Sequence, residues 1–270
     1  MSGVLIAVPH ASVRLPEDLK ERVGTHVDTE FLRAQSDMYT DTIYDVPGAT
    51  NVVYEWSRFV ADPNRFEGQK SEGGIVPIID FDERSIYRAN CEPVHAELEE
   101  RIARYHRPYH ERLRECIDEG DFHFFFDGHS MMSTAPKRSP DFGVHRPDAC
   151  LSNCGDERGE AIQGGRALVC SPEQTRLVQR LLREAFEALP APPHNEAVPV
   201  EGSVLLNKPF LGGHGVRTHA RPEQGMPGLQ IELNQRLWIE PRTGQPLPGR
   251  IDWIRRVVAQ LVSTLNEMSP

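Results

Sequence analysis

The strongest constraint on the fold is an alternation of short apolar runs with longer amphipathic stretches. The apolar runs have the length and composition of buried strands, and they span Val4–Val8, Thr50–Tyr54, Phe122–Asp127, Ala167–Cys170, Val204–Leu206 and Leu229–Leu233. Strands that alternate with helices predict a sheet covered by helices on both faces, within one α/β domain over residues 1–270. In such a domain we expect the chemistry in loops at the carboxyl ends of the strands.

Three stretches carry apolar residues at helical spacing. The first runs from Val94 to Ile117, and Pro108 is expected to kink or split it. The second has Ser171 as its N-cap and Pro172 at its first helical position, and it continues toward Leu189. The third closes the chain and places its apolar residues from 251 to 265 on one face.

Length and charge narrow the class of protein. A chain of 270 residues with 26% charged side chains is an ordinary globular protein. Its net charge of -10 opposes a general attraction to nucleic acid or anionic lipid, so we expect a small-molecule partner. The longest early apolar run, Val4–Val8, is too short for a secretory signal or a membrane span, which favours a cytoplasmic location.

Two histidines leave predicted strands in the same way. His10 follows the first strand and Pro9, while Asp127, His129 and the hydroxyl of Ser130 follow a run of three phenylalanines. Two imidazoles at neighbouring strand ends could share one zinc ion, which leaves room for one more protein ligand and an open water position. The alternative for each histidine is a structural role.

A carboxylate and a cationic loop complete the polar candidates. Glu232 interrupts an apolar strand, which is costly unless the carboxylate is paired, metal-linked or held with a raised pKa as a general base. Its alternative role is a salt bridge to Arg236 or another arginine. Asn64 and Arg65 follow a proline turn and suit a planar carboxylate. The glycine-rich segment 212–217 is either a close approach to a ligand or a mobile turn.

Taken in order, these motifs resemble the N-formylglutamate amidohydrolase family. The resemblance covers nearly the whole chain and rests on VPHAS, SDMYTD, DPNR, YHRPYH, DGHS and QIELNQR. That family is similar to the zinc carboxypeptidases and aspartoacylases. The resemblance therefore implies a three-layer phosphorylase/hydrolase-like α/β fold with a mixed sheet and one catalytic zinc. It also implies hydrolysis of N-formyl-L-glutamate to formate and L-glutamate, the last step of one route of histidine degradation.

The resemblance also implies roles for single residues. His10 and His129 look like two metal ligands, Asn64 and Arg65 like a clamp for the substrate carboxylate, and Glu232 like the base.

The metal ligands depart from the pattern of the carboxypeptidase-like relatives. Those relatives place a glutamate three residues after the first histidine, where this chain has Val13. We expect Asp37, from the helix that follows the first loop, to be the third ligand, although it could instead cap or solvate that helix. Asp127 is expected to orient His129.

The remaining candidates concern the substrate. Arg88 or Arg217 would stabilise the oxyanion, and Ser130 and Asn234 would contact the substrate. A glutamate side chain needs a second cationic anchor, for which Arg88, Arg138 and Arg217 are candidates.

Three alternative functions fit parts of the pattern. A deacylase for other N-acyl amino acids, or a small peptidase, would use the same constellation. A metal-free carboxylate-binding protein would fit the missing glutamate at Val13. A serine or cysteine hydrolase is disfavoured, because the chain has no GxSxG elbow and none of its five cysteines has an evident base partner.

Overall fold

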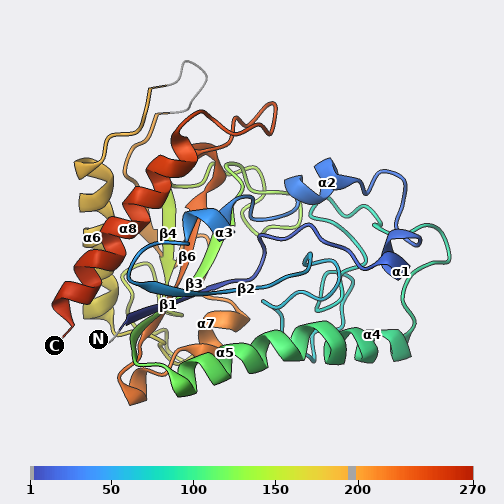
Figure 1. Cartoon of the computed structure of the whole chain (residues 1–270), viewed down its shortest axis with the longest axis horizontal. Coiled ribbons are helices and arrows are strands. Elements are labelled where there is room, and N and C mark those ends of the chain that lie inside the picture. Colours follow the sequence, from blue (N-terminus) through green and yellow to red (C-terminus); the bar gives the residue numbers. More distant parts are fainter. Residues whose placement is uncertain (1–2, 194–198, 270) are drawn as a thin grey trace.

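Six strands form one mixed sheet at the centre of the computed structural model, which describes residues 3–193 and 199–269 (Figure 1). The strands are β1 Gly3–Val8, β2 Ala49–Val53, β3 Phe122–Met131, β4 Ala149–Ser152, β5 Val204–Leu206 and β6 Gly228–Asn234. Their order is β2-β1-β3-β6-β4-β5. The first four in this order are parallel, whereas β4 runs antiparallel to β6 and parallel to β5.

Five of the predicted strands are confirmed, and the one predicted at Ala167–Cys170 is wrong. That segment passes the end of the sheet with single hydrogen bonds from Val169 N–H to the carbonyl of Asn153 and from Gly228 N–H to the carbonyl of Val169. It is buried without joining a ladder, which explains its apolar composition. The strand missing from the prediction is β4, whose sequence Ala149–Ser152 mixes apolar and polar residues.

The helices are α1 Glu17–Lys20, α2 Thr29–Ala34, α3 Thr40–Ile43, α4 His95–Arg101, α5 Arg107–Glu119, α6 Pro172–Ala188, α7 His214–His219 and α8 Arg250–Met268. Four of the helices, α4, α5, α6 and α8, lie in the three predicted stretches, and the shorter α1, α2, α3 and α7 lie outside them. The Ser171 side chain caps α6 by accepting from the backbone N–H of Gln174, as predicted. Short 3₁₀ turns lie at Pro222–Gln224 and Gln235–Leu237.

Pro108 splits the first helical stretch without ending it. The π-helical segment Ile102–His106 joins α4 to α5, and Pro108 stands in the first turn of α5. Because proline has no backbone N–H, one helical hydrogen bond is missing here, and the wider π turn accommodates its absence. The result is one long rod along an edge of the molecule (Figure 1).

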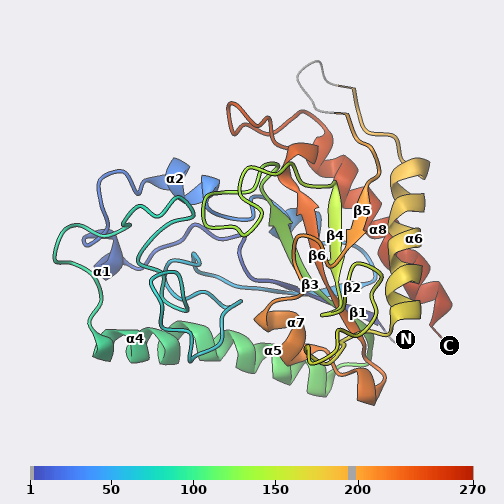
Figure 2. The ribbon, with the colours of Figure 1, turned by 180° about the vertical axis from the view of Figure 1, so that it is seen from behind.

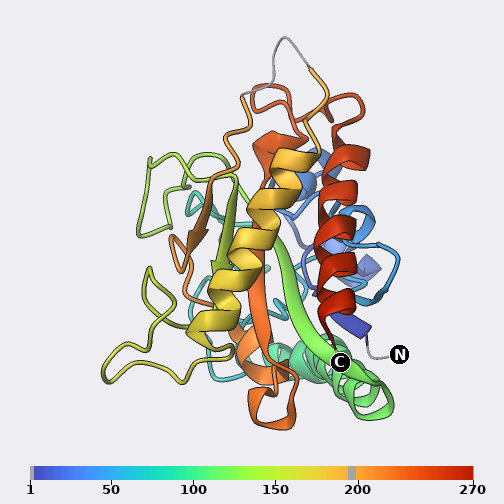
Figure 3. The ribbon, with the colours of Figure 1, turned by 90° about the vertical axis from the view of Figure 1, so that its left-hand side faces the viewer.

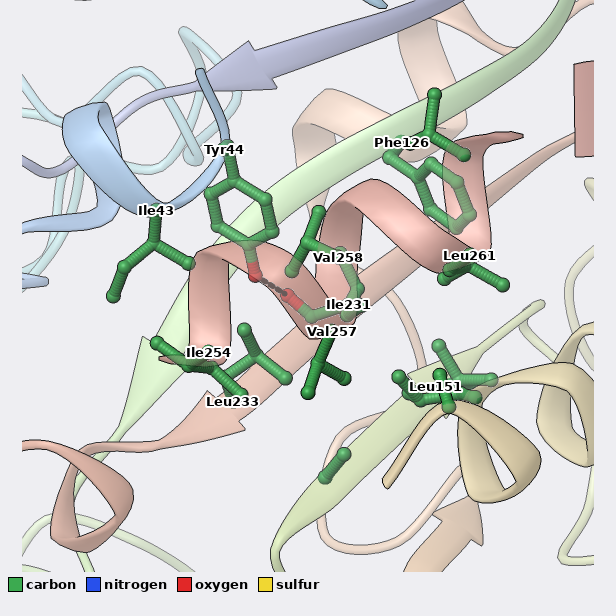
Figure 4. Close-up of a cluster of buried hydrophobic side chains, with 14 of the residues drawn as sticks. Ile43, Tyr44, Phe126, Leu151, Ile231, Leu233, Ile254, Val257, Val258 and Leu261 are labelled. Carbon is green, nitrogen blue, oxygen red and sulfur yellow. Dashed lines mark hydrogen bonds between the residues drawn. The ribbon is translucent and has the colours of Figure 1, made fainter. Parts of the chain in front are cut away.

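Helices cover both faces of the sheet, which confirms the predicted three-layer α/β fold. Figures 2 and 3 show α6 and α8 side by side on one face, while α5 and α7 lie on the other. The layer under α8 is apolar: Leu233, Ile254 and Val257 are fully buried there, and the hydroxyl of Tyr44 donates to the carbonyl of Ile231 (Figure 4). Burial of each such aliphatic side chain contributes about 1.5–3 kcal/mol.

The strand alternation decides where polar groups can lie. On β6, Leu229, Ile231 and Leu233 pack in the layer under α6 and α8, so Gln230 and Glu232 point to the opposite face. On β3, Asp127 and His129 share the face of Phe125 by the same alternation. The polar residues of both strands therefore lie together near their carboxyl ends.

The segments that follow β1 and β2 extend beyond this end of the sheet. They pack around an apolar cluster of their own, which includes Leu19, Val60 and Ile86. Among the residues described, no helix combines the length and the apolar composition needed to cross a bilayer.

Candidate active site

A pocket lies at the carboxyl ends of β1, β3 and β6. Asp127, His129 and Ser130 do not leave the strand as predicted, because β3 continues to Met131. Strand β3 pairs with β1 on one side and with β6 on the other, and its register sets His129 beside Glu232. His10 follows the end of β1 after Pro9. Polar residues dominate the wall of the pocket, among them His10, Ser36, Asp37, Arg58, Asn64, Arg65, His129, Ser130, Arg146, Gln230, Glu232 and Gln235.

Three buried side chains converge on one point of this pocket. Oδ2 of Asp37 lies 3.5 Å from Nδ1 of His10 and 3.2 Å from Nδ1 of His129. One possible ligand atom from each of the three residues lies within 4.8 Å of the others. Two imidazole nitrogens and a carboxylate oxygen are a donor set that suits zinc.

Asp37 reaches this point from a turn and not from a helix. It lies between α2 and α3, and its backbone N–H donates to the carbonyl of His10 over 3.0 Å. The helix expected around it is interrupted here, and its own carbonyl accepts the N–H and the hydroxyl of Thr40. These bonds join the turn to the end of β1.

A second carboxylate stands behind each histidine. Nε2 of His10 lies 2.8 Å from Oδ1 of Asp62, and Nε2 of His129 lies 3.3 Å from Oδ1 of Asp127. Asp127 is itself held by the N–H of Val216, at 2.9 Å. Each ring thus has a carboxylate at Nε2 and presents Nδ1 to the centre, which is how metal-binding histidines are usually oriented.

The charges of these groups affect one another strongly. Burial alone would raise the pKa of Asp37, but hydrogen bonds from His10 and His129 outweigh it and lower that pKa. Burial would lower the pKa of His129, yet Asp127 and Asp37 raise it well above its usual value. Four buried carboxylates, those of Asp37, Asp62, Asp127 and Glu232, surround two imidazoles, and a divalent cation would balance their charge.

Glu232 has a shifted pKa and no cationic side chain bonded to it among the residues described. Burial raises its pKa to about 8, the charge of Asp37 adds to this, and His129 opposes it. Its Oε1 accepts a hydrogen bond of 2.8 Å from Nε2 of Gln230. The alternative salt bridge is not formed, because Arg236 pairs with Asp148 at 2.5 Å.

Three arginines line the pocket, and two of them are paired. Arg58 binds Asp62, and Arg146 makes two bonds of 3.0 Å to Asp141. Arg65 donates through one terminal nitrogen to the carbonyl of Asn64, at 3.1 Å. Over the described parts of the chain, the buried Nε of Arg65 has no hydrogen-bond partner. Arg65 is thus the guanidinium best placed to receive an anionic ligand.

The family comparison identifies the kind of protein that carries this pocket. A sequence model described as N-formylglutamate amidohydrolase matches residues 2–239. The chain belongs to the N-formylglutamate amidohydrolase family. Two curated relatives are both named N-formylglutamate deformylase. The one from Pseudomonas putida is 26% identical over 253 residues, covering 88% of this chain and 82% of the relative. The one from Pseudomonas aeruginosa is 27% identical and covers 97% of this chain and 92% of the relative.

Solved structures share the fold. An N-formylglutamate amidohydrolase from Ralstonia eutropha JMP134 superposes with a TM-score of 0.67 at 23% identity, covering 98% of this chain and 93% of that one. The gene product Atu2144 of Agrobacterium tumefaciens gives 0.62 at 19% identity, covering 98% and 92%. At these identities the likeness establishes a common fold.

Two further predicted residues, Asn64 and Ser130, lie in the pocket wall, and each already makes hydrogen bonds within the protein. Oδ1 of Asn64 accepts from the N–H of Gly215 at 3.0 Å, and its Nδ2 lies 3.2 Å from Nε2 of His129. The hydroxyl of Ser130 accepts from Nε2 of Gln235 at 3.0 Å. Asn64 therefore lies against His129 and faces the pocket.

Three predicted residues do not reach the pocket. Arg88 and Arg217 are exposed, and their Nε atoms donate to the carbonyls of Val23 and Gly213. Asn234 is buried, but its Nδ2 donates to the carbonyls of Arg146 and Pro147, at 3.1 and 2.9 Å. A loop position says nothing of the direction in which a long side chain points, so the sequence could not exclude Arg88 and Arg217.

The sequence prediction missed Asp62, Gln230, Arg58 and Arg146. Asp62 and Gln230 left a signal, because the first stands in the DPNR motif and the second lies on the strand face of Glu232. Arg58 and Arg146 come from irregular segments, where no periodicity indicates direction.

Proposed function

We propose that this protein hydrolyses the amide of N-formyl-L-glutamate to formate and L-glutamate with one zinc ion held by His10, Asp37 and His129. The observation that carries the proposal is the convergence of Asp37 Oδ2 with two histidine Nδ1 atoms beside a buried glutamate. The names of the two curated relatives supply the substrate. By resemblance to the family, we place the reaction in histidine degradation in the cytoplasm.

The donor set fits zinc, because two nitrogens and one oxygen leave a coordination position open. When bound, zinc would supply Lewis-acid chemistry: it lowers the pKa of a water molecule toward 7 and polarises a carbonyl oxygen. Asp62 and Asp127 would fix the two imidazoles with Nδ1 directed at the ion.

Glu232 would move the proton. Its carboxylate takes a proton from the attacking water as the water oxygen bonds to the formyl carbon, and it returns that proton to the nitrogen as the C–N bond breaks. Burial raises the pKa of Glu232 to about 8 in the metal-free protein, and a bound cation would lower it toward the neutral range in which one group can both accept and donate a proton. Gln230 holds one carboxylate oxygen, which fixes the direction of the other.

Arg65 would bind the α-carboxylate of the substrate. Its unpartnered Nε and a terminal nitrogen form the planar fork that a carboxylate matches, and Nδ2 of Asn64 adds a neutral donor. Holding the carboxylate in this way makes the attack on the formyl carbon effectively intramolecular.

Arg138 would be the second cationic anchor. It lines a second pocket that adjoins the first one, and the two pockets share Arg58 and Arg65 in their walls. An elongated substrate with two carboxylates would place its α-carboxylate on Arg65 and its side-chain carboxylate near Arg138.

The test is formate release by zinc-loaded protein from N-formyl-L-glutamate, compared with N-formyl-L-glutamine under the same conditions. We expect a clear preference for the glutamate compound and loss of that preference in Arg138→Ala. Equal rates with both substrates in the unaltered protein would contradict the assigned substrate. No formate release from a protein that binds zinc would contradict the reaction.

A further inference from the structure

Four histidines gather behind the loop that carries Asn64 and Arg65, away from the candidate zinc ligands. His106 ends the π-helical segment and His110 follows four residues later in α5, so both lie on one face of the helical rod. His214 and His219 come from α7, which packs beside α5 (Figure 1). One possible ligand atom from each of His106, His110 and His214 lies within 4.8 Å of the others.

Backbone contacts define the tautomers of the first two rings. Nε2 of His106 lies 2.9 Å from the carbonyl oxygen of Arg65, and Nε2 of His110 lies 3.0 Å from that of Pro63. A carbonyl can only accept, so both Nε2 atoms carry the proton and both Nδ1 atoms keep a lone pair. A histidine that binds a metal usually donates its other ring N–H to such a partner.

The lone pair of His106 has no partner in the described chain. His106 is 2% exposed, and its Nδ1 is buried without a hydrogen bond. An orphaned buried acceptor is unfavourable unless a ligand satisfies it.

His219 extends the cluster. Its Nε2 lies 2.7 Å from Nδ1 of His110, and its own Nδ1 is buried without a partner in the described residues. A cation at Nδ1 of His110 would replace the proton that His219 donates. His219 would then move its proton to Nδ1 and offer Nε2 as a fourth nitrogen donor. The cluster opens to a surface pocket beside Glu67 and Thr218, through which an ion can enter.

We propose that His106, His110 and His214 form a second binding site for a divalent transition metal, separate from the site of His10, Asp37 and His129. Neutral nitrogen donors favour zinc, nickel or copper over magnesium or calcium. Because the Nε2 atoms of the same rings hold the carbonyls on either side of Asn64, an ion here would fix the loop that presents Arg65.

The test counts zinc bound to full-length protein that is first freed of metal and then loaded with Zn²⁺. We expect two equivalents in the unaltered protein and one each in His214→Ala and Asp37→Ala. The control is His95→Ala, which should keep two, because His95 is also the first residue of a helix and is exposed. His106→Gln keeps a donor for the carbonyl of Arg65 and should also bind one equivalent, and circular dichroism checks that each variant is folded.

The outcomes separate this site from the proposed active site. One equivalent that is lost in Asp37→Ala and kept in His214→Ala overturns the second site and leaves the proposed function intact. One equivalent that is lost in His214→Ala and kept in Asp37→Ala supports the second site and contradicts the catalytic zinc. No bound zinc contradicts both. Co²⁺ bound to Asp37→Ala protein should show the visible absorption of a nitrogen-coordinated tetrahedral ion, which His214→Ala in the same background should abolish.

Discussion

Glu232 is a buried carboxylate, which costs stability, and it is also the proposed general base. Its neighbours Ile231 and Leu233 pack under α8, and the strand alternation turns Glu232 to the polar face beside His129. Within the described residues this carboxylate accepts one side-chain hydrogen bond, from the uncharged amide of Gln230, so burial is the main cause of its raised pKa. A bound cation would offset that cost.

Replacing Glu232 by glutamine should abolish turnover and keep the metal. Glutamine preserves the size of the side chain but cannot accept the proton, so kcat should fall on the order of 10²–10⁴-fold. Formate release and zinc content are measured on the same preparation. A Glu232→Gln protein with nearly full turnover would remove Glu232 as the base.

The same substitution should change the stability of the metal-free protein. The pKa of Glu232 in the folded protein, about 8, lies above the ordinary glutamate value of 4.5, so the folded state binds more protons between these pH values and loses stability as pH rises. The slope is at most about 1.4 kcal/mol per pH unit for one group. We expect the free energy of unfolding, measured with denaturant, to fall less between pH 5 and pH 8 in Glu232→Gln than in the unaltered protein. An equal fall in both proteins would contradict the shifted pKa.

Arg65 should act mainly on substrate binding. Its removal deletes a charge-assisted contact to the α-carboxylate, worth roughly 1.5–3 kcal/mol, so KM for N-formyl-L-glutamate should rise at least tenfold. Arg88→Ala is the matched control, because Arg88 is exposed and does not line the pocket. Unchanged KM in Arg65→Ala, measured by initial rates, would refute the clamp.

At the scale of elements, the parallel strands could be predicted and the loops could not. The apolar runs located β1, β3 and β6, and their parallel pairing brings the residues around His10, His129 and Glu232 to one edge. Periodicity predicts strand faces because the side chains alternate. It predicts nothing for the irregular segments that supply Arg58 and Arg146, and it misread a buried loop at 167–170 as a strand.

Helix α7 should be as important to the site as the strands. Gly215 lies in its first turn, and a Cβ there would come within 2.5 Å of Oδ2 of Asp127. Gly215→Ala should therefore displace Asp127 from His129 and lower the zinc affinity of the active site about 10–100-fold. Gly3→Ala, whose Cβ would meet neighbours at 3.9 Å, is the control. Equal zinc affinity in both variants would show that α7 does not orient the site.

At the scale of the molecule, the pocket lies between the central sheet and the long segments that follow β1 and β2. The sheet supplies His129, Gln230 and Glu232, and the long segments after β1 and β2 supply Asp37 and Arg65 from beside their own apolar cluster. The motifs of this composite site come from several parts of the chain: VPHAS and SDMYTD at and after the end of β1, DPNR after β2, and DGHS and QIELNQR largely within β3 and β6. The site depends on the docking of these segments onto the edge of the sheet.

The most direct measurement follows formate release from N-formyl-L-glutamate by metal-free protein before and after addition of zinc, in the unaltered chain and in Asp37→Ala. We expect no turnover without metal, recovery with zinc in the unaltered chain, and no recovery in Asp37→Ala. Full turnover by the metal-free protein, or full recovery in Asp37→Ala, would contradict a catalytic zinc held by His10, Asp37 and His129.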